Sequence, residues 1–390
     1  MPLTSEQQHI IEVIQQPDCD MLLVDSVAGS GKSFTALESS SLEQFNNILY
    51  TAYNAKVVAD GKRKFDPRTT QCSTMHSIAY QNTVNQLGLT VGYFNPRDIS
   101  ERLPYETKLL ITEHVKYFCL SKYLKVDDYF ANRNDDTDEI IQSLVRKYLK
   151  QMRAKEIPTT HDFYLKLFHQ KLANKSIVFD EFDLIIVDEF GDIFPATLEI
   201  FKLLPAKKKL ALGDVSQALY AFNGCVNGFL ELNDYPNTKT VKLTESFRVA
   251  TPIANDIEEF MQEYINPAIS FIGQDHSTST IKTKGFVTKT NVELIGKMIE
   301  YNQCRTKYNL LRPVKSIFEL PLILMSLHKG QQIKPPEWRH LADDYREHKR
   351  LSEIPSFSQS FTSFLSEKYP FDIQLQSVFR LFRDHSYGDV

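Results

Sequence analysis

One short segment constrains the fold of this chain more than any other, the glycine-rich loop SVAGSGKS at residues 26–33. It follows the compact apolar run MLLVD at 21–25, typical of a buried strand, and precedes a helical pattern at 34–45. A strand, a glycine-rich loop and a helix in this order predict a phosphate-binding loop, because backbone amides at the helix start point toward an anion. The alternative is a glycine-rich turn that binds nothing, and the Lys-Ser pair that ends the loop argues against it.

The residue types within the loop predict a role for each position. Gly29 and Gly31 let the backbone approach the phosphates closely. Lys32 is expected to reach the β and γ phosphates, and the Ser33 hydroxyl to ligate Mg²⁺. The strict pattern begins with glycine, whereas Ser26 stands at that position here. With ATP and Mg²⁺ as the predicted cofactors, the predicted nucleotide-binding residues of the loop are Ala28, Gly29, Ser30, Gly31, Lys32 and Ser33.

Short apolar runs alternate with helical patterns on both sides of a long helical segment. Further strands are predicted at three such runs, residues 47–52, 183–188 and 209–213. Between about 81 and 178, amphipathic helical patterns predominate and no clear strand pattern appears. The sequence therefore predicts an α/β fold with one parallel sheet, into which residues 81–178 are inserted as a helical subdomain.

The 390 residues are enough for two or three domains. After about residue 240 the pattern weakens, and residues 238–246 and 284–291 are candidates for strands of a second sheet. The predicted domains are a first α/β domain at 1–80 plus 179–245, a helical insertion at 81–178, a partial second α/β domain at 246–314 and a helical segment at 315–390.

A pair of acidic residues marks the end of one predicted strand. The apolar run LIIV at 184–187 is followed by Asp188 and Glu189. In a parallel sheet, ligands bind at the edge formed by the carboxyl ends of the strands. There Asp188 can hold Mg²⁺ through water, and Glu189 can act as general base on the water that attacks the γ-phosphate. Such a pair alone is usually only solvated, but its place on the same sheet as the phosphate loop favours the functional interpretation.

Charge and cysteine content exclude several classes of protein. Lys and Arg total 45 against 49 Asp and Glu, a net charge of −4, so any basic surface for nucleic acid must be local. The 5 cysteines are dispersed without CxxC spacing, which argues against a zinc cluster and favours a reducing compartment. A signal peptide and a membrane span are not expected. We expect a location in the cytoplasm of a bacterium or a phage-infected host cell, or in the nucleus if the source is eukaryotic.

Further segments resemble superfamily 1 DNA helicases of the UvrD/Rep type, and above all their F-box DNA helicase branch. Residues 3–7 (LTSEQ) are similar to the adenine-reading Q motif, and residues 188–192 (DEFGD) to the DEFQD box. Residues 213–224 (GDVSQALYAFNG) and 243–248 (LTESFR) are similar to the family segments that follow this box. Residues 161–166 (HDFYLK) resemble a segment of the F-box branch. The resemblance implies RecA-like P-loop NTPase domains that hydrolyse ATP on single-stranded DNA.

The resemblance also implies roles for single residues. Gln7 would contact the adenine, Gln217 would sense the γ-phosphate, and Arg248 would contact that phosphate from the second domain. The implied catalytic residues are Lys32, Glu189, Gln217 and Arg248. The residues implied to bind DNA are Tyr53, Asn54, Thr74, His76, Tyr220 and Phe222. Stacked aromatic side chains contribute about 1–3 kcal/mol per base to such binding, although most of the 26 Phe and 18 Tyr residues must lie in the core.

Three features depart from the family pattern. Gly191 replaces the usual glutamine of the DEFQD box, and Asn223 replaces an arginine. The last two motifs of the family are not found, and residues 326–330 (SLHKG), which partly resemble one of them, are expected to form a loop. A helicase truncated in this way would bind nucleotide better than it turns it over, because a stabilising arginine is missing.

Two functions of different classes therefore remain open. The first is an ATP-dependent DNA helicase or translocase, moving 3′ to 5′ by resemblance, with single-stranded and duplex DNA as partners. The second is an ATP- and DNA-binding module with little unwinding, a regulator or half of a split helicase that a partner chain completes. A small-molecule kinase would leave Gln7, Gln217 and Arg248 unexplained. Basic residues of the insertion would contact duplex DNA by resemblance, or form an ordinary solvated helix face.

Overall fold

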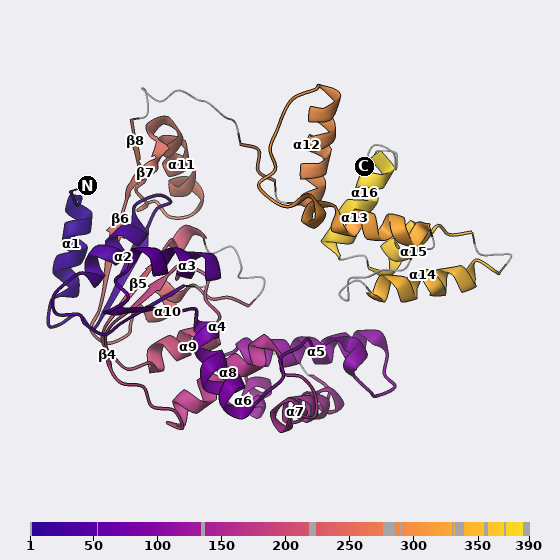
Figure 1. Ribbon diagram of the computed structural model, residues 1–390, viewed down its shortest axis with the longest axis horizontal. Helices are drawn as coiled ribbons and strands as arrows, with labels where there is room; N and C mark the ends of the chain where they lie inside the picture. The colour runs from indigo at the N-terminus through magenta and orange to yellow at the C-terminus, as the bar shows by residue number, and fades with distance from the viewer. Residues whose placement is uncertain are drawn as a thin grey trace. The chain divides into compact units, whose positions relative to one another are not determined.

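The computed structural model divides into two compact units, Met1–Thr278 and Ser279–Val390 (Figure 1). It describes residues 2–52, 54–133, 137–217, 224–275, 285–288, 290–329, 331, 339–354, 358–369 and 372–384. The boundaries of the four predicted domains stay predictions. None of the described helices is both long and apolar enough to cross a membrane.

A parallel sheet forms the centre of the first unit. Its strands are β1 (Met21–Ser26), β2 (Ile48–Ala52), β3 (Thr70–Cys72), β4 (Phe182–Asp188), β5 (Ala206–Gly213) and β6 (Thr238–Leu243). They lie in the order β3-β2-β4-β5-β1-β6, and every neighbouring pair is parallel. The carboxyl ends of β1 and β4, where the phosphate loop and the acidic pair begin, are thus separated by β5 alone. This confirms the predicted α/β fold.

Helices cover both faces of this sheet. They include α1 (Ser5–Ile14), α2 (Lys32–Ser40), α3 (Ala55–Lys64), α9 (Pro195–Leu203) and α10 (Gly228–Leu232). Because side chains alternate along a strand, Leu22 packs into the core that α1, α2 and α3 complete, and Leu23 packs into the core on the opposite face. Burial on both faces explains why β1, β2, β4 and the end of β5 are largely apolar runs in the sequence.

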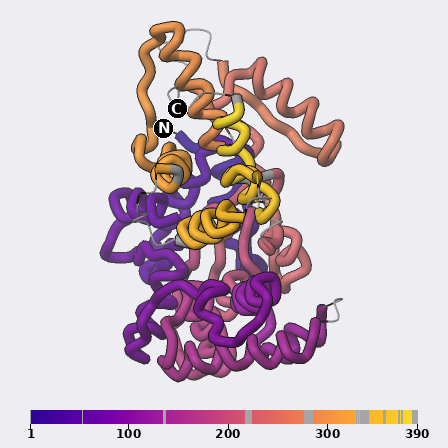
Figure 2. The backbone as a smooth tube through the Cα atoms, turned by 90° about the vertical axis from the view of Figure 1, so that its right-hand side faces the viewer, coloured from indigo at the N-terminus to yellow at the C-terminus, as the bar shows by residue number. Residues whose placement is uncertain are grey.

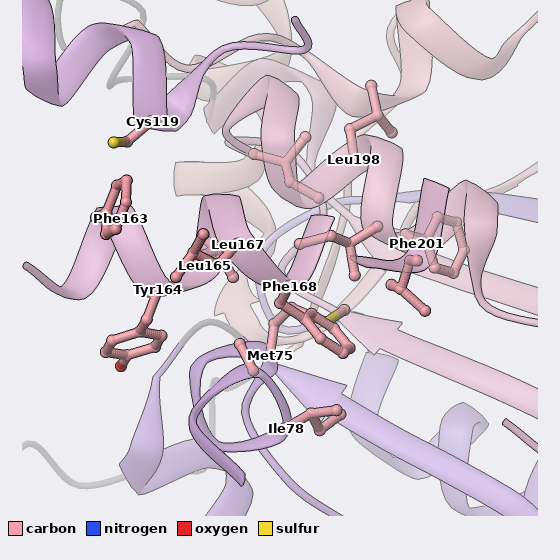
Figure 3. Close-up of a cluster of buried hydrophobic side chains, with 14 of the residues drawn as sticks. Met75, Ile78, Cys119, Phe163, Tyr164, Leu165, Leu167, Phe168, Leu198 and Phe201 are labelled. Carbon is pink, nitrogen blue, oxygen red and sulfur yellow. The ribbon is translucent and has the colours of Figure 1, made fainter. Parts of the chain in front are cut away.

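At residues 81–178, where the sequence analysis expected a helical insertion, the described chain is mostly helical. Its helices are α5 (Tyr105–Leu120), α6 (Val126–Ala131), α7 (Glu139–Ala154) and α8 (His161–Ala173), with short helical turns at Gln81–Asn85 and Pro96–Asp98, and α4 (Met75–Tyr80) directly precedes them. Helices α5 to α8 gather at one end of the first unit (Figures 1 and 2). Phe163 and Phe168 of α8 lie in the same apolar cluster as Met75 of α4 and Phe201 of α9 (Figure 3). The insertion therefore shares its core with the sheet.

The segment after β6 forms a small parallel pair of strands with one helix. These elements are β7 (Glu245–Ala250), α11 (Thr251–Tyr264) and β8 (Ile272–Gln274). The prediction that residues 238–246 belong to a second sheet is wrong for β6, because this strand pairs with β1 along its whole length. Of the other candidate strand at 284–291, the described residues 285–288, 290 and 291 are not in a strand either.

Helices form most of the described part of the second unit, whereas the sequence analysis expected a helical segment at 315–390 and a partial α/β domain before it. Its helices are α12 (Asn291–Gln303), α13 (Val314–His328), α14 (Arg339–Leu351), α15 (Phe361–Lys368) and α16 (Ile373–Asp384). Leu324, Leu341, Leu365 and Leu375 contribute to its apolar core. The loop predicted at 326–330 is wrong at its start, because residues 326–328 form the last turn of α13.

Candidate functional site

The loop between β1 and α2 has the backbone conformation that its glycines predict. Gly29 and Gly31 adopt φ angles of +82° and +84°, in the left-handed region that residues with a side chain rarely occupy. A Cβ atom at Gly31 would lie 2.8 Å from Nε2 of Gln7, and one at Gly29 would lie 2.6 Å from Cβ of Arg248. Glycine is therefore required at both positions, and Gly31 directly precedes the first residue of α2.

Ser26 has a structural role at the position where the strict loop pattern has glycine. Its hydroxyl is buried and donates a hydrogen bond of 2.6 Å to the carbonyl oxygen of Gly213, the last residue of β5. This bond ties the start of the loop to the neighbouring strand. The departure from the pattern thus leaves the path of the loop intact.

The acidic pair at the end of β4 lies directly beside the loop. The Ser33 hydroxyl donates to Oδ2 of Asp188 at 3.3 Å, and Nζ of Lys32 lies 3.7 Å from Oε2 of Glu189. Asp188 is 2% exposed, whereas the Glu189 side chain is 55% exposed. The structure therefore brings these four predicted residues together, with one carboxylate inside the protein and the other facing solvent.

Hydroxyl and carboxylate oxygens of this kind fit Mg²⁺, which proteins usually bind through one or two carboxylates together with phosphates of the substrate. In the part of the chain that the structure describes, no cluster of three or more His, Cys, Asp or Glu side chains could hold a metal ion alone. Ser33 and Asp188 could thus hold Mg²⁺ if phosphate oxygens completed its ligands.

Glu189 has an unusual backbone conformation for a residue with a side chain. Its φ angle is +61°, and its N–H donates to Oδ1 of Asp188 at 3.0 Å. A left-handed conformation costs about 1–2 kcal/mol for such a residue, and it persists where the surrounding structure imposes it, often at functional sites. The turn after β4 therefore has a feature that is typical of an active site.

Helix α1 holds Gln7 beside the loop. Oγ1 of Thr4 accepts from the Gln7 N–H at 3.2 Å, and Oε1 of Gln7 accepts from the Thr4 N–H at 3.1 Å, a reciprocal helix cap. Nε2 of Gln7 then points to the carbonyl oxygen of Ser30 at 3.5 Å. The amide of Gln7 is buried and joins the helix cap to the loop.

Strand β7 lies along the same loop. The Phe247 N–H donates to the carbonyl oxygen of Gly29 at 2.9 Å, and the Ser246 hydroxyl donates to that of Ala28 at 2.7 Å. Arg248 follows with an exposed side chain. Phe247, which the sequence analysis missed, is 42% exposed, and its ring lies 3.5 Å from where a Cβ atom of Gly31 would be. An exposed ring beside this loop is suited to contact a flat base. The position of Phe247 directly before Arg248 was the feature of the sequence that could have indicated it.

The turns after β4 and β5 pack closely against each other. A Cβ atom at Gly191 would lie 2.6 Å from the carbonyl oxygen of Asp214, so this close approach accounts for glycine where the family has glutamine. Gln217 ends the short helix Val215–Gln217, whose first N–H donates to Asp25 of β1 at 3.2 Å. The backbone of Gln217 therefore lies at the same edge of the sheet as the loop.

Three of the six predicted DNA-binding residues are described, and two of these cap helices. Oδ1 of Asn54 accepts from the Lys56 N–H at 2.8 Å, and Oγ1 of Thr74 accepts from the Ser77 N–H at 3.1 Å. Their side-chain oxygens thus have structural partners at the starts of α3 and α4. Tyr53, Tyr220 and Phe222 lie outside the described residues.

His76, the third, belongs to a cluster of four rings that joins α4 to α8. The Tyr164 hydroxyl lies 3.2 Å from Nδ1 of His76 and 3.1 Å from Nδ1 of His161. The exposed Tyr80 packs edge to face on Tyr164, with ring centroids 5.7 Å apart. Burial, with a smaller contribution from His161, lowers the pKa of His76, so its ring is neutral near pH 7. The resemblance of residues 161–166 to the F-box branch was noted from the sequence, but it gave no role to His161 or Tyr164.

One pocket of the first unit joins the acidic pair to this ring cluster. Its lining includes Asp188 and Glu189 as well as Thr74 and His76, with Phe201 among its apolar residues. Residues predicted for nucleotide chemistry and residues predicted for DNA thus line the same space.

Comparison with known proteins shows which proteins the chain is similar to. Residues 102–236 match the family described as UvrD/REP helicase N-terminal domain. Over these residues the chain is similar to UvrD-like helicases. Among the proteins similar to this chain is F-box DNA helicase protein 1 of Schizosaccharomyces pombe, which is 26% identical over 317 residues, covering 73% of this chain and 34% of that protein. F-box DNA helicase 1 of Gallus gallus is 28% identical over 286 residues, covering 65% of this chain and 27% of that protein.

The chain thus spans about a third of the length of these curated relatives. A solved structure of the Pif1 helicase from Bacteroides, in complex with ADP-AlF3 and single-stranded DNA, is similar over 79% of this chain and 58% of that chain. Its sequence identity is 14% and its TM-score is 0.33.

Proposed function

We propose that this chain is an ATP-dependent DNA translocase of the helicase class. The observation that carries the proposal is the approach of the loop to the acidic pair, with Ser33 at 3.3 Å from Asp188 and Lys32 at 3.7 Å from Glu189. These residues are suited to bind one triphosphate and to activate one water molecule. The DNA helicase names of the relatives support the choice of substrate.

Each residue of the site has a definite task in this proposal. Lys32 and the amides of the loop bind the β and γ phosphates. Mg²⁺ held by Ser33 and Asp188 would neutralise charge that develops on the phosphate oxygens. Glu189 accepts a proton from the attacking water, as its exposed carboxylate permits. Gln217 and Arg248 act at the γ-phosphate, and Gln7 and Phe247 contact the base.

Single-stranded DNA is proposed to lie along the starts of α3 and α4 and over the ring cluster. Tyr53, Asn54, Thr74, His76, Tyr220 and Phe222 are the proposed contacts. Because the pocket lined by His76 also reaches Asp188 and Glu189, DNA bound there can change the geometry of the hydrolytic site. Translocation from 3′ to 5′ is proposed from the family resemblance alone.

Duplex DNA is proposed to contact basic residues of the insertion. Two of them already form ion pairs, Arg146 with Asp127 at 2.7 Å and Lys147 with Glu101 at 2.5 Å. Both pairs favour a solvated helix face at those positions. Lys122, Lys125 and Lys150 are the better candidates for phosphate contacts, and a weaker salt dependence of duplex affinity after their removal would support this role.

A second candidate function is a nucleotide- and DNA-binding module that a partner chain completes. One observation favours it: Ile253, Phe260 and Tyr264 of α11 are each more than half exposed. These side chains lie beside the small sheet of β7 and β8, which has two strands in the part of the chain described here. An apolar partner surface that adds strands to this sheet would cover them.

The test is the rate of ATP hydrolysis by the chain alone, with and without single-stranded DNA. We expect DNA to stimulate hydrolysis and Lys32→Ala to abolish it. Binding of ATP·Mg²⁺ and DNA without hydrolysis would support the second candidate. Hydrolysis that Lys32→Ala leaves unchanged, or a folded chain that binds neither ligand, would contradict the proposal.

A further inference from the structure

Tyr50 lies in the middle of β2 and reaches the acidic end of the neighbouring strand. In the register of the sheet, Tyr50 is beside Ile186 and Ala52 is beside Asp188. Because side chains alternate with a period of two, Tyr50 and Asp188 project from the same face. The Tyr50 hydroxyl donates to Oδ2 of Asp188 at 2.9 Å, and both side chains are buried.

Few donors form hydrogen bonds to the carboxylate of Asp188. Oδ1 accepts from the Glu189 N–H at 3.0 Å, and Oδ2 accepts from the hydroxyls of Tyr50 and Ser33. Ser33 must turn toward a metal ion if it is to ligate one, which leaves Tyr50 as the side-chain donor that stays on Oδ2.

Helix α3 holds the ring of Tyr50 from the other side. The rings of Tyr50 and Phe65 have centroids 4.5 Å apart. At Gly61 of α3 the backbone approaches the ring so closely that a Cβ atom would lie 2.8 Å from Cε1 of Tyr50. The same helix begins at Asn54, its N-cap and a proposed DNA contact. Tyr50 therefore contacts both the helix that starts at the DNA surface and the carboxylate at the nucleotide site.

We infer that Tyr50 is a positioning residue that fixes the carboxylate of Asp188 toward Mg²⁺ and transmits movement of α3 to it. This inference rests on the proposed function, because it assigns a role in binding Mg²⁺ with nucleotide. The sequence did not indicate this role of Tyr50, because the residue has the pattern of any other residue in a buried strand.

The experiment measures Mn²⁺ binding in the presence of a non-hydrolysable ATP analogue, with free Mn²⁺ quantified by electron paramagnetic resonance. We expect Tyr50→Phe to raise the half-saturating Mn²⁺ concentration about tenfold, as for loss of a hydrogen bond to a charged group. Affinity for the analogue without metal should not change. The ratio of DNA-stimulated to basal ATP hydrolysis should fall, because the link from α3 is broken.

Two further variants separate this role from a general effect on packing. Gly61→Ala displaces the Tyr50 ring from the side of α3 without removing its hydroxyl, and should weaken Mn²⁺ binding in the same direction. Tyr148→Phe removes another buried hydroxyl, one that accepts from the Ser100 N–H at 2.9 Å in the insertion, and should leave Mn²⁺ binding unchanged. If Tyr50→Phe does not fold, the comparison of Mn²⁺ binding by Gly61→Ala and Tyr148→Phe tests the inference.

Wild-type Mn²⁺ affinity in folded Tyr50→Phe or Gly61→Ala would overturn the inference. That result differs from failure of the proposed function, in which the wild-type chain itself would bind no Mn²⁺ with the analogue. Equal losses of Mn²⁺ affinity in Tyr50→Phe and in the Tyr148→Phe control would also overturn the inference.

Discussion

The edge of the sheet and the helical insertion both bury charged side chains, but the partners of those side chains differ. At the sheet edge, Asp188 is bonded by the hydroxyls of Ser33 and Tyr50, groups that a ligand can rearrange. In the insertion, the fully buried Lys166 donates to backbone carbonyl oxygens of residues 121 and 123, just after α5. The hydrogen bonds of Asp188 can be exchanged for bonds to a ligand, whereas those of Lys166 satisfy backbone carbonyl oxygens at the end of a helix.

This difference teaches that burial of an ionisable group does not by itself mark a functional site. Burial lowers the pKa of Lys166 to about 8 and, with a smaller contribution from Lys166, that of His169 to about 3. Neither residue lines the pocket that contains Asp188 and Glu189. Groups with a shifted pKa are candidates for function. Asp188 and Glu189 differ from Lys166 and His169 in two ways: their side-chain partners can be exchanged for a ligand, and they line a pocket.

The largest effect is expected from Glu189→Gln at the sheet edge. This change keeps the size of the side chain and removes the proposed base, so kcat should fall by about 10²–10⁴-fold. Nucleotide affinity should change little, because the Glu189 side chain is largely exposed. Single-turnover hydrolysis and equilibrium binding measure the two quantities, and an unchanged kcat would remove Glu189 from the proposed mechanism.

In the insertion, Lys166→Ala should change stability instead of catalysis. The variant leaves a cavity and two carbonyl oxygens without their donor, so the free energy of unfolding should fall by about 2–4 kcal/mol. Urea denaturation measures this loss, and Lys150→Ala on the exposed face of α7 is the matched control. If the folded Lys166→Ala chain no longer binds nucleotide, the contrast between the two regions is wrong.

The pH dependence of stability sharpens the same contrast. Because the pKa of His169 in the folded chain lies below the usual value of 6.5, the unfolded chain binds this proton more tightly. Its contribution to stability is therefore present above pH 6.5 and is lost as the pH falls toward 3. Between pH 7 and pH 5 the loss should be about 2 kcal/mol, and His169→Gln should remove it. The comparison uses urea denaturation at both pH values, and equal losses in wild type and variant would contradict it.

The smallest effect is expected where the two regions meet, at the ring cluster. Tyr164→Phe removes the hydroxyl that lies between His76 and His161. Affinity for single-stranded DNA should fall about fivefold, as for loss of one hydrogen bond of about 1 kcal/mol. Fluorescence anisotropy with a labelled oligonucleotide measures this change. Tyr148→Phe, remote from the cluster, should bind as the wild type does, and an equal loss in both variants would exclude a specific role.

The sequence predicted the sheet and the path of the glycine-rich loop well because both are local patterns. The run at 21–25, the glycines and the Lys-Ser pair are consecutive in the chain, so strand, turn and helix follow from neighbouring residues. The position of the acidic pair followed from the rule that parallel strands end at a common edge.

Other features depend on which distant segments pair, and a local pattern does not contain that information. Residues 238–243 read as a strand in either sheet, and only pairing with β1 decides between them. Tyr50 reads as an ordinary core residue until β2 and β4 lie side by side. The end of α13 at residues 326–328 was predicted as a loop because no strand pattern precedes it, whereas the helix continues up to His328.

The most direct test of the central claim is equilibrium binding of a fluorescent, non-hydrolysable ATP analogue, with and without Mg²⁺, to the wild type, Lys32→Ala and Asp188→Asn. If the loop and the acidic strand end hold the same metal-bound triphosphate, Mg²⁺ tightens binding to the wild type. Asp188→Asn should then lose this tightening, and Lys32→Ala should weaken binding under both conditions. Affinities and Mg²⁺ dependence that match the wild type in both folded variants would contradict the account.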